Sequence, residues 1–594
     1  MPATSSVVKD QPAPTPDPTA ARADPPPTRR WDWRSRLAHA RHKVSSREGW
    51  LGDYNYSWLC MPVLPFTRRK HSQPPFYALH AELPLLLAIT TGFQHSLAML
   101  AGLITPPIIF ASSLNLDANL SAYMVSASLI GCGILSLVQM SRIRLFRNYY
   151  LGTGLITVVG TSFATLSTAT AIFDSLYANG KCPSTTASDG TVTRGACPDA
   201  YGYLLGTALL CSLLEIGMSF INPRRLQKIF PPIVTGTVIV LIGASLVGSS
   251  GIPNWGGGSN DCMSRPTSGI FQLCPTISAP RPLPWGSPEF IGLGFLSFVT
   301  IILVELFGSP FMKNISIILG LLVGCIVAGA AGYIDSSNID SAPAITFLWV
   351  HTFRIRVYAP AILPMLAVYV SLAMEAIGDI TASAEVSRVD VDGPEFDTRI
   401  QGGVLSDGLG GLLSALFTVT PLSIFAQNNG VIAITRCANR TAGRWCCVFL
   451  ILFGVLGKIS GVFLSIPNPV LGGVTTFLFS SVVVSGIRVL SYNRFTRRDR
   501  FVLAAAFSFG IGDLLVPEVF THLFDGVNNP SSGLQGLFDS ITIVLSTPFL
   551  MAGIVAAVLN LILPEEFDFG GMKDGQQDEE AEVVDVEAGT HEKK

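Results

Sequence analysis

The chain has few charged residues and few signs of catalytic chemistry. Only 13% of its 594 residues are Asp, Glu, Lys or Arg, about half the fraction found in soluble globular domains. Its apolar stretches contain no HExxH, no GxSxG in a nucleophile context and no Cys/His metal spacing, which argues against an enzyme, a metal site or a cofactor. We also find no secretory signal peptide and no concentrated basic face, so we expect neither secretion nor nucleic-acid binding.

Hydrophobic sequence takes the place of charge. Apolar residues make up 49% of the chain, the mean hydropathy is +0.47, and there are 56 glycines, which allow close helix packing in membranes. The composition predicts an all-α polytopic membrane protein with about fourteen spans. We place the spans near 83–109, 120–140, 148–175, 201–221, 231–250, 289–309, 314–334, 361–383, 401–418, 419–436, 444–465, 469–490, 500–517 and 540–563.

Charge differs between alternate loops. Lys and Arg gather near 142–147, 224–228, 436–444 and 494–500, and the positive-inside rule makes these loops and both termini cytosolic. Two of the opposite loops carry cysteine pairs. Disulfides form outside the cytosol, and the simplest connectivity joins Cys182 to Cys197 and Cys262 to Cys274.

Short matches indicate an internal repeat of seven spans. The sequence PIVTG at 232–236 opens the fifth span and PVLGG at 469–473 opens the twelfth. Because seven is odd, the two halves have opposite topology, as in many secondary transporters. Such matches also arise by chance in membrane helices. In this register the tenth span has the third as its partner, and Pro or Gly interrupts both.

An amide cluster stands out in the tenth span. Gln427, Asn428 and Asn429 lie between a proline and a glycine in apolar sequence. Irregular backbone at membrane depth is tolerated where it lines a cavity or is buried in protein. The cluster is therefore our first candidate for a binding site.

Ionisable groups inside spans are costly and are candidates for function. Glu375 and Asp379 share one helical face at i, i+4, Asp407 lies in the ninth span, and Gln94 and His95 lie in the first. Structural hydrogen bonding is the alternative for all five, and it is the preferred interpretation for Gln94 and His95. Three acids near span ends are expected to face the interface: Glu215, Glu305 and Asp513.

These side chains suit a small planar heterocycle better than sulfate or bicarbonate. The Gln427 amide gives and takes a hydrogen bond at once, as a nucleobase edge requires. Glu375 accepts from ring N–H groups, backbone N–H groups at a helix break near Ala426 bind a carbonyl, and Phe163 stacks on or walls the ring.

At these residues the sequence resembles the nucleobase–ascorbate transporter family, and most closely its fungal uric acid–xanthine permeases. The family signature stands at 427–436 as QNNGVIAITR, with the Gln94–His95 pair, the acidic eighth span and Asp407 in order along the chain. The resemblance runs from about residue 80 to about residue 564.

The resemblance implies fourteen helices with short strands in the third and tenth spans. It also implies proton symport, elevator-type movement and a homodimer in the membrane lipid. The domains it implies are a cytosolic tail (1–82), a core domain (83–222 and 361–465), a gate domain (229–334 and 469–563) and an acidic cytosolic tail (565–594).

By position, the resemblance also implies roles for single residues. Gln427, Glu375, Phe163 and Ala426 would bind the purine. The residues that would order the site or support proton coupling are Asn428, Asn429, Asp379 and Asp407, with Gln94 and His95 beside them. Those that would set specificity or gating are Arg436, Arg488 and Phe549.

The sequence thus predicts a multi-pass plasma-membrane symporter that takes up xanthine and uric acid with protons. An anion exchanger or sulfate carrier with the same seven-plus-seven plan is the alternative among transporters. A channel and a membrane-embedded enzyme are further alternatives.

Overall fold

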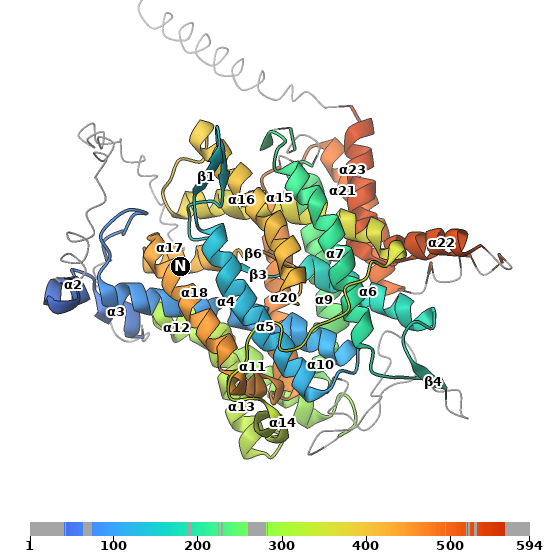
Figure 1. Ribbon diagram of the computed structural model, residues 1–594, viewed down its shortest axis with the longest axis horizontal. Coiled ribbons are helices and arrows are strands. Elements are labelled where there is room, and N and C mark those ends of the chain that lie inside the picture. The colour runs from blue at the N-terminus through green and yellow to red at the C-terminus, as the bar shows by residue number, and fades with distance from the viewer. Residues whose placement is uncertain are drawn as a thin grey trace, which may run out of the picture.

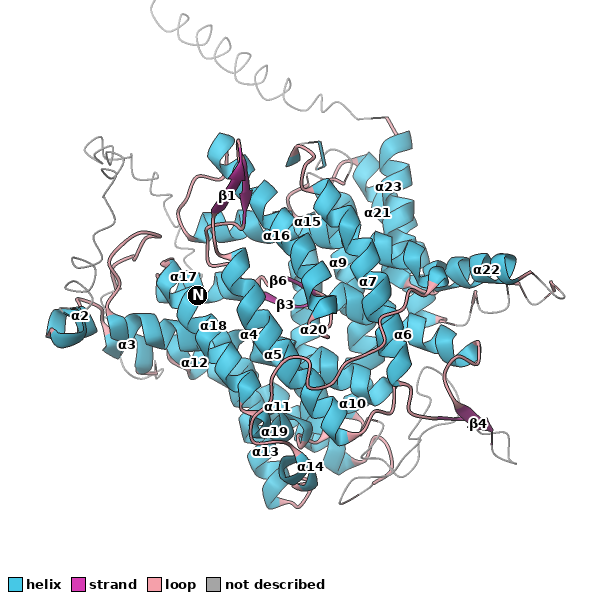
Figure 2. Cartoon of the chain, viewed as in Figure 1, coloured by secondary structure: helices cyan, strands magenta, loops and turns pink. Residues whose placement is uncertain are grey.

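The structure is a computed structural model, and helices make up most of its regular secondary structure (Figures 1 and 2). It describes residues 41, 43–62, 74–186, 192–223, 225–226, 230–258, 281, 283–493, 495–517, 519–520, 523–524, 526–527 and 531–564. The predicted pair Cys262 and Cys274 lies outside the described residues, as do 1–40 and 565–594 of the two tails.

Many helices begin at a proline that follows a Ser or another residue in extended conformation. Pro198, Pro288 and Pro310 open helices in this way, because the first turn needs no N–H from its residue and the proline φ already fits. The elements up to residue 341 are α2 (Arg47–Leu51), α3 (Tyr56–Cys60), α4 (Leu85–Ser113), α5 (Ala118–Gln139), β1 (Ile143–Phe146), β2 (Tyr149–Leu151), β3 (Val159–Thr161), α6 (Phe163–Ala178), β4 (Ser184–Thr186), β5 (Val192–Arg194), α7 (Pro198–Met218), α9 (Pro232–Leu246), the π-helix η1 (Val247–Gly251), α10 (Ile252–Trp255), α11 (Pro288–Phe307), α12 (Pro310–Asn314), α13 (Ser316–Ala330) and α14 (Ser337–Ser341).

The second part of the chain continues the helical pattern with a single short strand. Its elements are the 3₁₀ turn η2 (Ala359–Ala361), α15 (Ile362–Val386), α16 (Pro394–Leu416), β6 (Leu422–Ile424), α17 (Gln427–Thr435), α18 (Arg440–Val455), α19 (Gly457–Leu464), α20 (Asn468–Leu490), α21 (Arg497–Leu515), α22 (Ser532–Leu545) and α23 (Pro548–Ile562). Every predicted span overlaps one or more of these helices.

The helices have the length and composition of membrane spans. Within the described residues, seven helices are long and apolar enough to cross a membrane, or nine when each of two bent pairs is taken as one span. The predicted count of about fourteen stays a prediction. Protein buries 78% of the apolar window of α4 but only 28% of that of α11, so α4 lies inside the molecule and α11 at its periphery.

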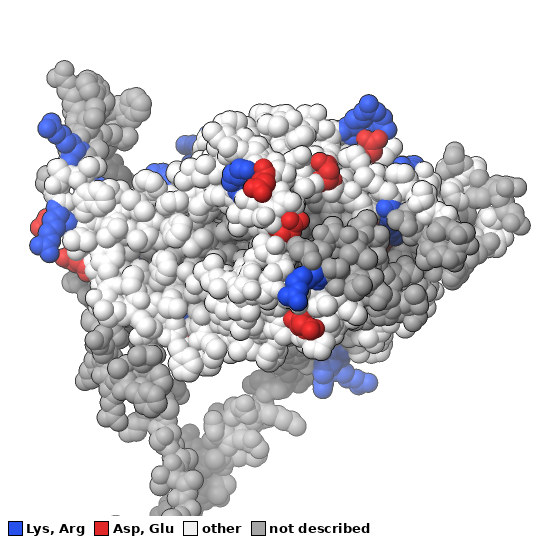
Figure 3. All heavy atoms as spheres, turned by 90° about the horizontal axis from the view of Figure 1, so that it is seen from below, with Lys and Arg blue, Asp and Glu red and all other residues white. Residues whose placement is uncertain are grey.

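Charged side chains are sparse on the surface. In the face drawn in Figure 3, Lys, Arg, Asp and Glu form small separate groups on a mostly uncharged surface. Large apolar side chains such as Phe295, Leu306, Ile326 and Val484 are exposed on α11, α13 and α20. An exposed apolar surface of this kind suits contact with lipid.

The helices pack in two groups, each drawn from both halves of the chain. Helices α4 to α7 pack against α15 to α19, whereas α9, α10, α11 and α13 pack against α20, and α9 also packs against α21 and α23. α12 and α22 contact helices of the first group as well. Glycines allow the closest crossings. A Cβ on Gly236 of α9 would lie 3.0 Å from the Gly486 carbonyl of α20, and a Cβ on Gly486 would lie 3.0 Å from the Gly236 carbonyl. Small residues at such contacts let helix backbones approach in a membrane.

Two short strands lie near the middle of the molecule (Figure 2). β3 and β6 pair antiparallel, with Val159 opposite Ile424 and Thr161 opposite Leu422. The ladder continues at one end, where the Phe425 N–H donates to the Val158 carbonyl at 3.0 Å. The strands expected in the third and tenth spans are confirmed, and the two broken spans complete each other's backbone hydrogen bonds as the membrane interior requires.

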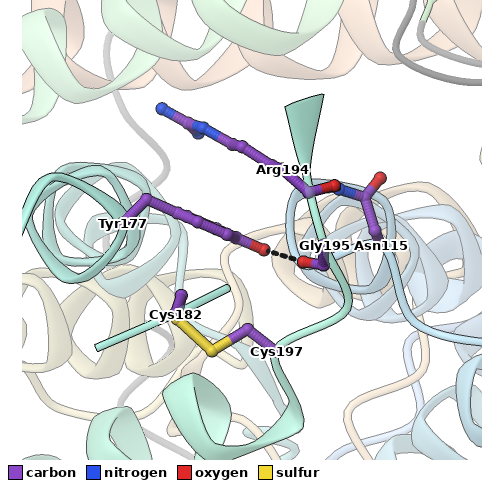
Figure 4. The surroundings of a disulfide bond; sticks show 6 residues. All are labelled: Asn115, Tyr177, Cys182, Arg194, Gly195 and Cys197. Carbon is purple, nitrogen blue, oxygen red and sulfur yellow. Dashed lines mark hydrogen bonds between the residues drawn. A yellow bond between two sulfur atoms is a disulfide. The ribbon is translucent and has the colours of Figure 1, made fainter. Parts of the chain in front are cut away.

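A disulfide closes the loop between α6 and α7 (Figure 4). Cys182 and Cys197 are bonded, in agreement with the predicted pairing, and the hairpin β4–β5 lies between them. The Tyr177 hydroxyl donates to the Gly195 carbonyl at 2.7 Å, and the Asn115 amide donates to the Arg194 carbonyl at 2.9 Å. These contacts fix the loop against the ends of α4 and α6.

Two predicted spans are bent, and the predicted placement of two acids is wrong. The stretch 540–563 is not one straight span, because the chain bends by 85° between α22 and α23, where Pro548 lacks the N–H that a continuous helix needs. The stretch 444–465 bends by 77° between α18 and α19. Glu215 and Asp513 do not face an interface, since only 1% and 3% of their surface is exposed.

Candidate functional site

The site is built around the two strand-to-helix turns. α6 begins at Phe163 directly after β3, and α17 begins at Gln427 two residues after β6. Among the described residues, the backbone N–H groups of Ala426, Gln427 and Asn428 have no hydrogen-bond partner. The first N–H groups of a helix carry partial positive charge and bind oxygen acceptors. The turn therefore presents donors inside the molecule.

Aromatic rings cover these turns. The rings of Phe163 and Phe425 stack with centroids 5.4 Å apart, and Phe479 of α20 meets Phe163 edge-on at 5.7 Å. A Cβ on Gly160 would lie 2.6 Å from the Phe425 ring, and one on Gly102 would lie 2.7 Å from it. The two glycines thus make room for Phe425, and the stacked pair gives the turns a flat apolar wall of the kind that planar ligands use.

The two asparagines are tied to neighbouring helices. Asn428 Oδ1 lies 2.8 Å from His95 Nδ1 of α4, and Asn429 Oδ1 accepts from the Ser383 hydroxyl of α15 at 2.6 Å. The Gln427 amide, in contrast, is only half-buried and has no partner in the described part of the chain. The asparagines therefore anchor the start of α17, while Gln427 is free to bind a ligand.

Gln94 is the other amide close to this region. It is fully buried, and within the described residues both its Oε1 and its Nε2 lack a partner. Leaving a buried polar atom unpaired costs about 1–3 kcal/mol. Sequence reasoning favoured a structural role for Gln94 and His95. The His95 contact agrees with that interpretation, but Gln94 has no structural hydrogen bond to explain it.

A group of buried acids lies behind β6. Asp407 of α16 accepts from the Ser423 hydroxyl at 2.9 Å, and the carboxyl of Glu215 of α7 lies within hydrogen-bonding reach of Asp407. α7 and α16 approach closely here, since a Cβ on Gly408 would lie 2.9 Å from the Ile216 nitrogen. Two carboxyl groups in such contact repel each other strongly when both are ionised.

Sequence reasoning missed Glu215. It lies in α7 near the end of the predicted fourth span, and this position led us to place it at the interface. The signal was present, because it is a single acid in the apolar run LLGTALLCSLLEIG at 204–217. An acid inside a span is a candidate for function by default.

Glu375 lines a cavity next to α9 and α23. With Phe549 it lines a cavity of about 210 Å³ between α9, α15 and α23. The other lining groups are mostly apolar, with Thr235 and Ser371 as the hydroxyl-bearing exceptions. The structure therefore brings Glu375 and Phe549 together, whereas Gln427, Ala426 and Phe163 are not among the residues that line this cavity.

The remaining predicted residues lie on α15, α17 and α20. Asp379 is half-buried one turn after Glu375 on α15. Arg436 ends α17 in a left-handed conformation, with φ of 57°, and its carbonyl accepts from the Tyr77 N–H at 2.9 Å. Arg488 is exposed in the last turn of α20. Of the three residues predicted to set specificity or gating, Phe549 shares a cavity with Glu375, a predicted ligand-binding residue.

Comparisons with known proteins identify related permeases. Residues 87–519 match the model of a family described as Permease family. Three curated relatives are similar over most of their length: the purine permease of Emericella nidulans is 51% identical over 93% of this chain and 95% of its own, the uric acid–xanthine permease of the same fungus is 50% identical over 89% and 90%, and the xanthine permease XanQ of Escherichia coli is 31% identical over 82% and 93%.

A solved structure is also similar in part. The transmembrane domain of a cyanobacterium bicarbonate transporter, BicA, aligns with a TM-score of 0.49 and 14% identity over 76% of this chain and 100% of that one.

Proposed function

This chain belongs to the nucleobase–ascorbate transporter family, and on that premise we propose that it takes up the oxidised purines xanthine and uric acid. Members of the family are permeases, so the chain is a transporter and not an enzyme. The names of its fungal relatives, purine permease and uric acid–xanthine permease, support this substrate class.

The observation that carries the proposal is the start of α17. Gln427 has a free amide, the backbone N–H groups around it are unpaired in the described chain, and the Phe163–Phe425 stack lies beside it. An amide reads the donor–acceptor edge of a purine, a stacked aromatic wall holds the flat ring, and helix N–H groups bind its carbonyl oxygens. A spherical anion would gain no stacking contact from the flat aromatic wall.

We propose that a proton enters with the purine. The buried carboxyl pair of Glu215 and Asp407 touches β6 through Ser423, so a change in its protonation acts directly on the strand that leads to Gln427. Buried acids inside spans are typical of proton relays. With Glu375 on the adjacent α15, these acids supply the proton-binding groups.

We further propose that the two packed groups of helices move relative to each other. The group α4–α7 with α15–α19 holds both strand-to-helix turns, and it meets the other group at the cavity that Glu375 and Phe549 line. It would act as the mobile core and the other group as the gate, in a homodimer in the plasma membrane with both termini cytosolic. Inverted-repeat transporters alternate access largely by moving one bundle of helices against the other.

Uptake of radiolabelled xanthine in cells that lack their own purine carriers tests the proposal. We expect saturable uptake that unlabelled uric acid competes and sulfate does not, and that rises as the external pH falls. Competition by sulfate would favour the anion carrier over the purine symporter. Uptake that never saturates would favour a channel.

Replacing Glu215 with glutamine is expected to reduce xanthine uptake by roughly 10-fold or more and to flatten its pH dependence. A glutamine keeps the shape and the hydrogen bond of the side chain but cannot exchange a proton, and an altered buried charge-assisted hydrogen bond costs about 1.5–3 kcal/mol. Uptake at several pH values and surface expression measure this. Glu305→Gln on exposed α11 is the matched control; equal pH profiles for both variants would exclude Glu215 from coupling.

A further inference from the structure

A group of arginines surrounds a second cavity, far along the chain from the turns of β3 and β6. Arg142, Arg440 and Arg444 line a cavity of about 160 Å³ together with Leu137, Met140 and Ser141. Arg142 lies three residues after the end of α5, and the other two lie in the first two turns of α18. The loops that hold these arginines are the ones that the positive-inside rule assigns to the cytosol.

The arginines carry more positive charge than the local acid balances. Arg142 donates to Glu395 Oε1 at 2.7 Å and to the Thr398 hydroxyl at 3.0 Å, and Arg399 donates to the same carboxylate oxygen at 2.9 Å. Glu395 is thus shared by two guanidinium groups. Among the described residues the side chains of Arg440 and Arg444 have no hydrogen-bond or ion-pair partner. In the described residues, the three lining arginines and Arg399 therefore have one ion-pairing carboxylate, that of Glu395.

The guanidinium groups of Arg142, which lines the cavity, and of Arg399 beside it are held in place before any ligand arrives. The side chain of Arg142 is only 20% exposed and lies 4.9 Å from the centre of the Tyr150 ring. Arg399 is 6% exposed and donates to the Thr153 carbonyl at 3.0 Å. Fixed guanidinium forks bind the oxygens of phosphate groups in bidentate fashion. The N-terminus of the sixteen-residue α18 adds partial positive charge on the same side.

We propose that this arginine cavity binds a phosphate group, supplied either by the headgroup of an anionic lipid or by free phosphate. The proposed purine site does not need this phosphate, and the phosphate proposal does not depend on which substrate is transported. The lining also includes Leu137, which is 40% exposed, so an apolar edge lies next to the charged groups. That combination matches the boundary between lipid headgroups and acyl chains.

The test uses the purified full chain in nanodiscs. Its thermal unfolding is compared in phosphatidylcholine alone, in phosphatidylcholine with phosphatidylinositol, and in phosphatidylcholine with inorganic phosphate against sodium chloride of equal ionic strength. We expect a higher Tm with phosphatidylinositol. A rise with inorganic phosphate alone would make free phosphate the ligand, and no rise in either arm would overturn the proposal.

The double variant Arg440→Gln/Arg444→Gln should lose that rise, and its affinity for fluorescent phosphatidylinositol should fall roughly 10-fold or more. The control is Arg354→Gln/Arg356→Gln, which removes the same charge from two exposed arginines between α14 and η2. If the double variant fails to fold, Arg444→Gln alone replaces it, because Arg444 is exposed. The site would be contradicted if the control lost as much affinity for phosphatidylinositol as the double variant. It would also be contradicted if neither Arg440→Gln/Arg444→Gln nor Arg444→Gln lost any.

Discussion

Replacing Gln427 with alanine is expected to abolish or severely weaken xanthine uptake while the protein still reaches the cell surface. Gln427 is the amide of the cluster that has no partner in the described chain, and its neighbours Asn428 and Asn429 are held by His95 and Ser383. Alanine leaves the purine edge unpaired in the site. Losing two such hydrogen bonds costs about 2–3 kcal/mol, or roughly 30- to 150-fold in apparent affinity.

The measurement is initial uptake of radiolabelled xanthine over a range of concentrations, with surface protein quantified in parallel. Gln535→Ala is the matched control, since Gln535 lies on exposed α22 and bonds only to Asp539 of the same helix. Alanine is tolerated at the first position of a helix, so loss of folding is not expected. Normal uptake by the Gln427 variant would refute the site assignment.

The broken spans could be predicted because their cause is local. Proline and glycine interrupt the sequence at 419–436, and polar residues stand where a continuous helix would face lipid. Those features depend on the nearest neighbours in the chain, and the structure has a strand and a new helix there. The disulfide between Cys182 and Cys197 was predictable for a similar reason, since the cysteines of that pair share one short loop.

The partners of buried groups could not be predicted in the same way. Glu215 meets Asp407 across 192 positions of sequence, because Gly408 lets α7 approach α16. Hydropathy places both acids in spans, but it does not report which helix faces which. The same limit explains Glu375: its place on α15 follows from the sequence, whereas the cavity it shares with Phe549 depends on how α23 packs after the bend at Pro548.

The cavity that Glu375 lines sharpens what its own substitution should do. On the wall of a mostly apolar cavity a carboxylate is costly, and packing alone would favour an apolar side chain there. Glu375 lies on α15 and lines the cavity that α15 forms with α9 and α23, where the two groups of helices meet. We infer that it acts when the purine passes this boundary, as an acceptor for a ring N–H or for the coupled proton.

Glu375→Gln should therefore reduce xanthine uptake by roughly 10-fold or more, because the amide offers a weaker acceptor and binds no proton. We expect the variant to lose most of its pH dependence as well. Initial uptake rates at several pH values, normalised to surface protein, measure both effects, with Glu289→Gln in the exposed first turn of α11 as the control. If the Glu375 variant transported as fast as the unaltered chain and with the same pH dependence, Glu375 would have only a structural role, and Glu215 with Asp407 would remain as the proton-binding pair.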